Sequence, residues 1–167
     1  MILMRIKNKK KLIDSIIDNY KENRFKISRN LIYGSPGSGK SFIGKLIASK
    51  LDTSLCFDLK LEDPGTSLLT LWKTVRPTKE KPMIIQIDEF DVLINKLHNN
   101  KIEKKCDWMR YQLFDKQSYN TFMSEYLICL PYVIYIFTMN VEPDIINKMD
   151  KSYIRENRID KIYKLEK

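Results

Sequence analysis

The chain has little of what a metal centre, a disulfide-bonded fold or a membrane span would require. It contains a single histidine, His98, and an odd number of cysteines, Cys56, Cys106 and Cys129, whose separation matches no metal-ligand spacing. We therefore expect reduced thiols. The longest strongly apolar stretch, 126–137, is short and interrupted by a proline, and the lysine-rich N-terminus lacks a signal-peptide apolar region. These absences predict a soluble, intracellular, cytoplasmic protein without a transmembrane segment.

The strongest bias in composition is a formal net charge of +9. A basic face is typical of nucleic-acid binding, so this alternative stays open. The positive charges cluster only at 7–11 and 101–105, however, and each cluster is short enough to be a solvated helix end or loop. The length of 167 residues fits one domain, and a content of 43% apolar residues suffices for a core.

Segments typical of strands alternate with segments typical of helices. Apolar runs predict strands at 30–33, 54–59, 83–87, 132–138 and 161–165, and helical periodicity predicts helices at 12–20, 42–50, 67–75, 119–126 and 144–148. A turn is expected at 63–65, and an exposed loop at 96–107. We expect an N-terminal helix and lead-in over 1–29, then a nucleotide-binding core over 30–167. The alternation predicts a three-layer α/β/α fold with a mostly parallel sheet.

A glycine-rich loop follows the first predicted strand and has the Walker A pattern G-x-x-x-x-G-K-[ST]. Its residues are Gly34, Ser35, Pro36, Gly37, Ser38, Gly39, Lys40 and Ser41. Backbone N–H groups of such a loop bind phosphates, and the following helix adds its positive dipole. We expect Lys40 to be a surface-facing charge on the β and γ phosphates of ATP, and Ser41 to bind Mg²⁺. Chance produces this pattern in about one chain in a hundred of this length.

The buried strand predicted at 83–87 ends in two acids, which is the form of a Walker B element. Ligands bind at the carboxyl ends of strands in open α/β sheets, so Asp88 is placed to hold Mg²⁺ through water. Glu89 is then the candidate base that orients and deprotonates the attacking water. Acids also begin helices without any catalytic role, and we interpret Asp91 in that way.

Asn140 follows the strand predicted at 132–138. If that strand lies between the two that carry the Walker elements, Asn140 reaches the γ-phosphate or the attacking water. The alternative is that this asparagine caps the next helix.

In their order and spacing, these elements resemble those of AAA ATPases. The likeness rests on the phosphate loop with Pro36, the Asp88–Glu89 pair, the Thr-x-Asn of 138–140 and the segment 149–160. This last segment is similar to the family stretch Leu-Asp-Pro-Ala-Leu-Leu-Arg-Pro-Gly-Arg-Ile-Asp. Within the family, the chain looks closest to the mitochondrial inner-membrane chaperone that assembles respiratory complexes and to ATPases of large DNA viruses. A viral source would imply the host cell cytoplasm.

The resemblance implies a P-loop NTPase sheet of strand order 5-1-4-3-2, with the five predicted strands numbered along the chain. It also implies Mg²⁺-dependent ATP hydrolysis that drives remodelling of a protein or complex. Arg155 and Arg158 match the two family arginines that reach the nucleotide of a neighbouring subunit. We therefore expect a homo-oligomeric ring or a partner ATPase subunit, with a protein as the substrate to be remodelled.

The chain departs from the family pattern at three points. Glu156 and Asn157 replace a Pro-Gly pair, no aromatic pore loop follows the second predicted strand, and the residues after Asp160 are too few for the helical lid domain. The missing pore loop argues against polypeptide threading. Two alternatives to a remodelling ATPase follow: a clamp-loader-like or helicase-like ATPase that depends on nucleic acid, and an ATP-binding interaction subunit that does not hydrolyse ATP.

Overall fold

The computed structural model describes residues 2–6, 8–63, 67–105 and 112–166. Its centre is a six-stranded sheet of order β1-β6-β2-β5-β4-β3, and every neighbouring pair is parallel. The strands are β1 (Ile2–Ile6), β2 (Ile27–Tyr33), β3 (Leu55–Cys56), β4 (Met83–Ile87), β5 (Val133–Met139) and β6 (Lys161–Leu165). The predicted fold class and the predicted order of five strands are confirmed. The edge strand β1, which pairs with β6, was not predicted.

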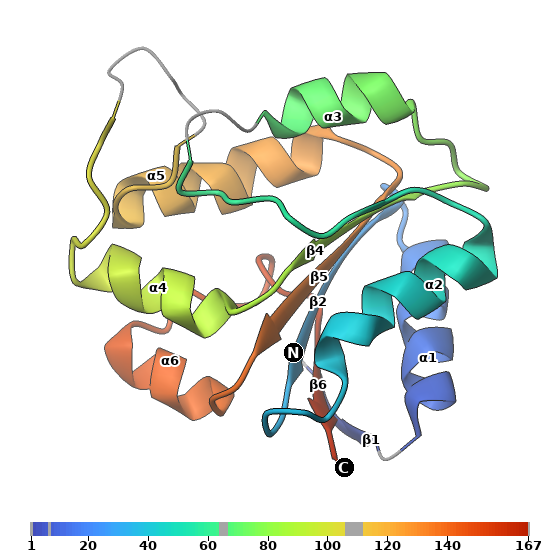
Figure 1. Ribbon diagram of the computed structural model, residues 1–167, viewed down its shortest axis with the longest axis horizontal. Helices are drawn as coiled ribbons and strands as arrows, with labels where there is room; N and C mark the ends of the chain where they lie inside the picture. The colour runs from blue at the N-terminus through green and yellow to red at the C-terminus, as the bar shows by residue number, and fades with distance from the viewer. Residues whose placement is uncertain (1, 7, 64–66, 106–111, 167) are drawn as a thin grey trace.

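Helices cover both faces of the sheet and complete three layers (Figure 1). They are α1 (Lys9–Glu22), α2 (Ile43–Leu51), α3 (Leu68–Val75), α4 (Phe90–His98), α5 (Lys116–Thr121) and α6 (Pro143–Met149). Apolar side chains of α1 and α2 form one core cluster against the sheet, and those of α3, α4, α5 and α6 belong to the cluster on the other face. None of the helices in the described ranges is long and apolar enough to cross a membrane.

The central strands β4 and β5 explain why their sequences read as continuous apolar runs. Every residue of both strands is buried. Ile134 and Ile136 belong to the core on the α1 and α2 side, whereas Val133, Tyr135 and Phe137 belong to the opposite core. A strand covered on both faces needs apolar side chains at successive positions, so alternation between polar and apolar residues disappears.

Several predicted segments differ from the structure. The strand predicted at 54–59 is reduced to the two residues of β3, at the edge of the sheet. On the helix predicted at 42–50, Phe42 and Leu46 are 60% and 40% exposed, so they do not belong to its buried face. The loop predicted at 96–107 begins later, because α4 continues to His98 and buries Leu97. Residues 64–66 and 106–111 lie outside the described residues. The turn predicted at 63–65 therefore lies partly outside them, and Cys106 lies entirely outside them.

An ion pair joins the residue before β6 to β2. The side chains of Arg29 and Asp160 form an ion pair of 2.8 Å and are only 12% and 18% exposed. Asp160 also accepts a hydrogen bond from the backbone N–H of Arg29, and the N–H of Asp160 donates to the carbonyl of Arg29. The segment before β6 is therefore held against the first half of β2.

The substitution Asp160→Asn should lower the free energy of unfolding by about 1–3 kcal/mol, because it leaves a mostly buried guanidinium without its counter-charge. Chemical denaturation measures this loss. The matched control is Asp52→Asn, which removes an ion pair with Lys81 whose side chains are 91% and 62% exposed, and which should leave stability nearly unchanged. Equal losses in the two variants would contradict a stabilising role for the Arg29–Asp160 pair.

Candidate active site

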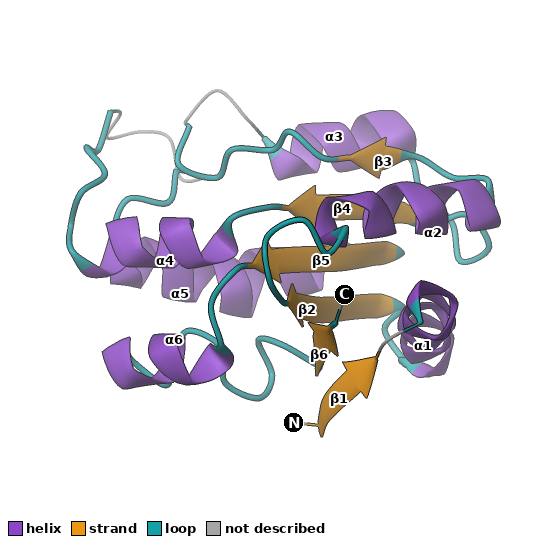
Figure 2. Ribbon diagram, turned by 60° about the horizontal axis from the view of Figure 1, so that its bottom comes forward, coloured by secondary structure: helices purple, strands orange, loops and turns teal. Residues whose placement is uncertain are grey.

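The carboxyl ends of β2, β5 and β4 lie side by side at one edge of the sheet (Figure 2). The phosphate loop follows β2, Asp88 follows β4, and Asn140 follows β5. Because β5 lies between β2 and β4, three segments that are far apart in the sequence meet at this edge. Such an edge is where open α/β sheets bind ligands.

Two glycines show why the phosphate loop needs this residue. Gly39 has a φ of 89°, a conformation that side chains disfavour. At Gly34 a Cβ atom would lie 2.3 Å from the backbone oxygen of Leu165 in β6, so only glycine fits. Gly34 also donates its N–H to the carbonyl of Met139, at a distance of 3.3 Å, which ties the start of the loop to the end of β5. Ser35, Pro36 and Gly37 are exposed at the tip of the loop.

Lys40 is buried, with 7% of its surface exposed, so the expectation of a surface-facing lysine is wrong. Its Nζ donates to the backbone carbonyls of Gly34, at 2.7 Å, and Ser35, at 3.0 Å. Burial lowers the pKa of Lys40, while the charges of Asp91 and Asp88 oppose that shift. The ammonium group therefore shapes the loop in addition to placing a charge inside it.

The carboxylate of Asp88 is oriented by two neutral donors. The hydroxyl of Thr138 in β5 and the amide of Gln86 in β4 both donate to Oδ1, at 2.6 and 2.9 Å. Within the described residues, Oδ2 of Asp88 accepts no hydrogen bond. One oxygen is thus held by the sheet, and the other keeps its lone pairs for a ligand. Neither Thr138 nor Gln86 was predicted as a site residue, although Thr138 lies in the Thr-x-Asn pattern.

Glu89 connects β4 to α4 in a left-handed conformation, with a φ of 54°. It occupies the N-cap position of α4, but its side chain makes no capping hydrogen bond. It is also exposed. The left-handed conformation costs a non-glycine residue about 1–2 kcal/mol, and this turn places Glu89 beside the carboxyl end of β4.

Asp91 and Asn140 link α4 to the end of β5. Asp91 lies in the first turn of α4, as expected, but it is buried, and its Oδ2 accepts the backbone N–H of Asn140 at 3.2 Å. The side chain of Asn140 is exposed. Glu142 occupies the N-cap position of α6, although its side chain makes no capping hydrogen bond, so the alternative interpretation of Asn140 as the helix cap is wrong.

The polar atoms around the loop fit phosphates and a magnesium ion. Ser38 Oγ and Asp91 Oδ1 are buried and have no hydrogen-bond partner among the described residues. Ser41 is exposed directly after Lys40, and its hydroxyl and Asp88 Oδ2 are hard oxygen donors. Mg²⁺ prefers oxygen ligands and commonly combines one or two carboxylates with substrate phosphates and water. The residues at this edge therefore suit Mg²⁺ bound together with a nucleotide.

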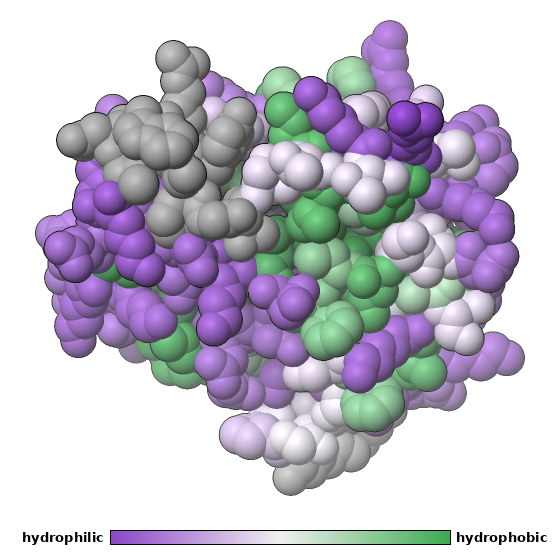
Figure 3. Space-filling view, turned by 45° about the horizontal axis from the view of Figure 1, so that its top comes forward, coloured by the Kyte–Doolittle hydropathy of each residue, from purple (hydrophilic) through white to green (hydrophobic). Residues whose placement is uncertain are grey.

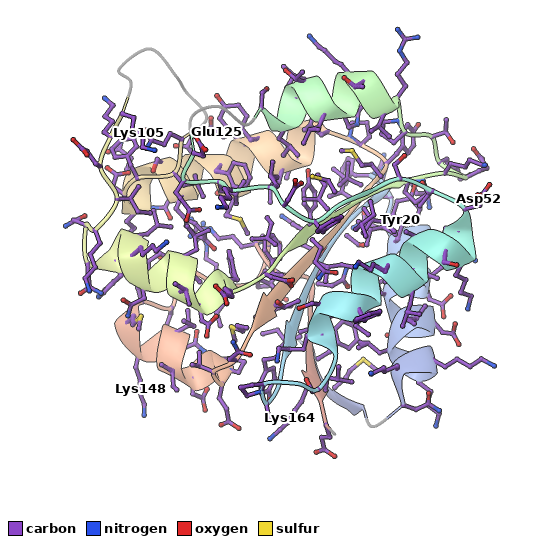
Figure 4. The ribbon with its side chains drawn as sticks, in the orientation of Figure 1. Tyr20, Asp52, Lys105, Glu125, Lys148 and Lys164 are labelled. Atoms are coloured by element: carbon purple, nitrogen blue, oxygen red, sulfur yellow. The ribbon has the colours of Figure 1, made fainter. Side chains whose placement is uncertain are left out.

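Two further lysines bring positive charge close to the phosphate loop. A Cβ atom built on Gly39 would lie 2.4 Å from Nζ of Lys9, the first residue of α1. Lys164 in β6, labelled in Figure 4, has its Nζ 5.9 Å from the ring centre of Tyr33 and 3.3 Å from a carboxylate oxygen of Glu142. Sequence reasoning missed both, because only the fold brings α1 and β6 beside the loop.

The structure does not bring the two predicted arginines to this edge. Arg155 is exposed and lines a cavity of about 400 Å³ together with Asn23 and Ile27, at the beginning of β2. The six residue steps from Ile27 to Tyr33 separate this cavity from the phosphate loop by roughly 20 Å. Arg155 therefore lies near the opposite end of the strand from the phosphate loop of its own chain.

Arg158 is only 4% exposed. Its guanidinium donates to the carbonyl of Ser152 and lies 5.6 Å from the ring centre of Tyr119. Burial lowers the pKa of Arg158. The side chain thus packs within its own chain, unlike that of Arg155.

A second cavity, of about 290 Å³, lies between α3 and the helical segment 122–129 that follows α5. Leu61, Leu68, Phe122 and Tyr126 are among its lining residues, and Figure 3 shows hydrophobic side chains gathered on this face. This apolar lining does not suit a triphosphate, so the candidate site is the carboxyl edge of the sheet.

The left-handed conformation of Glu89 leads to a prediction about stability. Glu89→Gly should be more stable than Glu89→Ala by about 1–2 kcal/mol, because glycine adopts a positive φ without strain. Comparison of the two denaturation curves measures this difference, and the carboxylate is absent from both variants. Equal stability would contradict the left-handed conformation of this residue.

Comparison with known proteins agrees with the geometry of the site. Residues 30–167 match the model of the family described as ATPase family associated with various cellular activities (AAA). A search of curated proteins found no match. Since the family match extends over most of the chain and includes the phosphate loop, Asp88 and Asn140, the protein belongs to the AAA family of ATPases.

Proposed function

We propose that this chain binds Mg²⁺-ATP at the carboxyl edge of its sheet and hydrolyses it. The observation that carries the proposal is the position of β5 between β2 and β4, which gathers the phosphate loop, Asp88 and Asn140 at one edge. Membership in an ATPase family supports the same activity. The dependence on Mg²⁺ and the roles of the individual residues are our inference from the geometry.

Binding of the triphosphate is assigned to the loop 34–41. Its backbone N–H groups and the helical turns after it offer partial positive charge to the phosphates. The ammonium group of Lys40 is already inside the loop, where it donates to the carbonyls of Gly34 and Ser35. To bind ATP, it needs only to exchange these carbonyls for phosphate oxygens. Ser41 and Asp88 would hold the metal ion, which supplies charge neutralisation of the phosphates.

Glu89 and Asn140 are assigned to the attacking water. The carboxylate of Glu89 is exposed and makes no capping hydrogen bond, so it is available to orient the water and accept its proton. The exposed amide of Asn140 offers a neutral contact to the water or to the γ-phosphate. Correct placement of the water is the main demand of phosphoryl transfer.

The pair Glu89→Gln and Lys40→Ala tests these roles. Glu89→Gln should bind Mg²⁺-ATP with wild-type affinity but lose turnover, because the amide keeps the shape and cannot accept a proton. Lys40→Ala should lose ATP binding while keeping its fold, as checked by circular dichroism. Lys50→Ala, which removes an exposed lysine of α2, is the control and should leave binding unchanged.

Isothermal titration and phosphate release measure both steps. Wild-type ATP affinity in a folded Lys40→Ala protein would overturn the assignment of the loop, and wild-type turnover in Glu89→Gln would reduce Glu89 to a helix-start acid. If the unmodified protein binds ATP but releases no phosphate, the alternative of an ATP-binding interaction subunit replaces hydrolysis.

We also propose that Arg155 completes the site of a neighbouring subunit. Arg155 is exposed, and the length of β2 separates it from its own phosphate loop. A head-to-tail contact between subunits would bring it to the next nucleotide, where an arginine stabilises charge in the transition state. The buried position of Arg158 supports a packing role for that residue instead. The partner is a second copy of this chain, as in a ring, or a related ATPase subunit.

Mixing of inactive variants tests this shared site. Glu89→Gln and Arg155→Ala should each be nearly inactive alone, since loss of such an arginine costs about 10³–10⁵ in rate. Mixed one to one, they should regain about a quarter of the wild-type activity, because an Arg155→Ala subunit keeps its own glutamate and borrows an arginine. Phosphate release after subunit exchange is the measurement.

A mixture of Glu89→Gln with Lys40→Ala serves as the control. It should stay inactive, because neither subunit holds both an intact loop and an intact glutamate. Absence of recovery in the first mixture despite verified co-assembly would argue against action in trans, and a fully active monomer would refute it.

We propose that ATP hydrolysis drives remodelling of a protein or complex, because the chain resembles AAA proteins. The resemblance to the respiratory-complex assembly chaperone and to ATPases of large DNA viruses is part of this proposal. The net charge of +9 favours a second candidate, an ATPase that depends on nucleic acid. Turnover that rises several-fold on addition of DNA or RNA would move this second candidate to first place.

A further inference from the structure

Gln86 is a buried polar residue in the middle of the apolar strand β4, with 1% of its surface exposed. Its side-chain amide makes three hydrogen bonds. Oε1 accepts the backbone N–H of Gly44 in α2 at 2.9 Å, while Nε2 donates to the carbonyl of Ser41 at 3.1 Å and to Asp88 Oδ1 at 2.9 Å. One side chain thus connects the phosphate-loop helix to the acid at the end of β4.

The absence of a side chain at Gly44 makes room for this arrangement. A Cβ atom there would lie 2.3 Å from Oε1 of Gln86, closer than any contact allows. A buried amide is costly unless its donors and acceptor are paired, and three of its four hydrogen-bonding positions are used here. Gly44 and Gln86 therefore fit one another as a pair.

We infer that Gln86 is a positioning residue that sets the geometry of the metal site between Ser41 and Asp88. This inference rests on the proposed function, because Ser41 and Asp88 are the residues that would hold Mg²⁺. The backbone carbonyl of Ser41 and Oδ1 of Asp88 both accept hydrogen bonds from Nε2 of Gln86. The amide therefore fixes the position of Ser41 relative to Asp88.

The same contact also determines which oxygen of Asp88 is available. Gln86 and Thr138 both donate to Oδ1, so the carboxylate cannot rotate without breaking two hydrogen bonds. Groups that orient a metal ligand in this way typically contribute a factor of about 10–100 to metal affinity. An apolar residue at position 86 would fill the space but leave the carboxylate held by Thr138 alone.

Asn30 provides a matched comparison for a purely structural role. It is 0% exposed, and in the sheet both Asn30 and Gln86 are in register with Ile136, from opposite sides of β5. Its amide donates to Ser28 Oγ and to the carbonyl of Tyr135, and its carbonyl oxygen accepts from Asn19. Asn30 therefore ties α1 to the sheet, and none of these hydrogen bonds involves Ser41 or Asp88.

The test compares Gln86→Leu with Asn30→Leu. Binding of Mn²⁺, a paramagnetic substitute for Mg²⁺, is measured by electron paramagnetic resonance with ATP and protein present. Gln86→Leu should bind Mn²⁺ in the ATP complex about 10–100-fold more weakly than the wild type, while ATP affinity in EDTA stays unchanged. Asn30→Leu should lose stability but keep wild-type Mn²⁺ affinity. Gly44→Ala, which displaces the amide by steric contact, should reproduce the metal defect of Gln86→Leu.

The outcomes separate this inference from the proposed function. A wild-type protein that binds no ATP overturns both. A wild-type protein that binds and hydrolyses ATP, together with a Gln86→Leu variant of wild-type Mn²⁺ affinity, overturns only the role of Gln86. If Gln86→Leu and Gly44→Ala both fail to fold while Asn30→Leu folds, Gln86 is a structural residue and the inference is wrong.

Discussion

The candidate site depends on one constraint, the placement of β5 between β2 and β4 in a parallel sheet. Parallel strands end at the same edge, so the loop after each strand meets the loop after its neighbour. Hydrogen bonds then connect the three segments: Gly34 donates to Met139, Asn140 donates to Asp91, and Thr138 donates to Asp88. The geometry of the candidate site is therefore a property of the sheet as much as of the loops.

Much of the fold could be predicted because its central strands are long apolar runs, buried on both faces. β4 and β6 were predicted to the residue, and β5 to within one residue at each end. The edges of the sheet could not be predicted in the same way. β3 has two paired residues, and β1 is held by pairing with β6, which no local pattern reveals. Phe42 and Leu46 follow the periodicity of a buried face but are exposed, and Phe42 precedes α2, in a 3-10 turn.

At the site, motifs predict residue types and spacing but not how side chains are held. Lys40 matches the motif, yet its burial follows from two loop carbonyls that only the folded loop presents. In the sequence, Gln86 is a single polar residue that interrupts an apolar strand. Its hydrogen bonding depends on Gly44, 42 positions earlier in the chain. Arg158 has the spacing of an exposed family arginine, but Ser152 and Tyr119 hold it inside. Contacts that form only in the folded chain decide all three cases.

The separation of Arg155 from the phosphate loop has a consequence for assembly. One chain carries the candidate nucleotide site at the carboxyl edge and this arginine beside the beginning of β2. A contact that joins the two therefore uses different surfaces of two subunits. Such a heterologous contact leaves one site and one arginine unpaired in any open chain of subunits, and only ring closure pairs them all. If Arg155 acts as proposed, the number of active sites equals the number of subunits in a closed ring but falls one short in an open assembly.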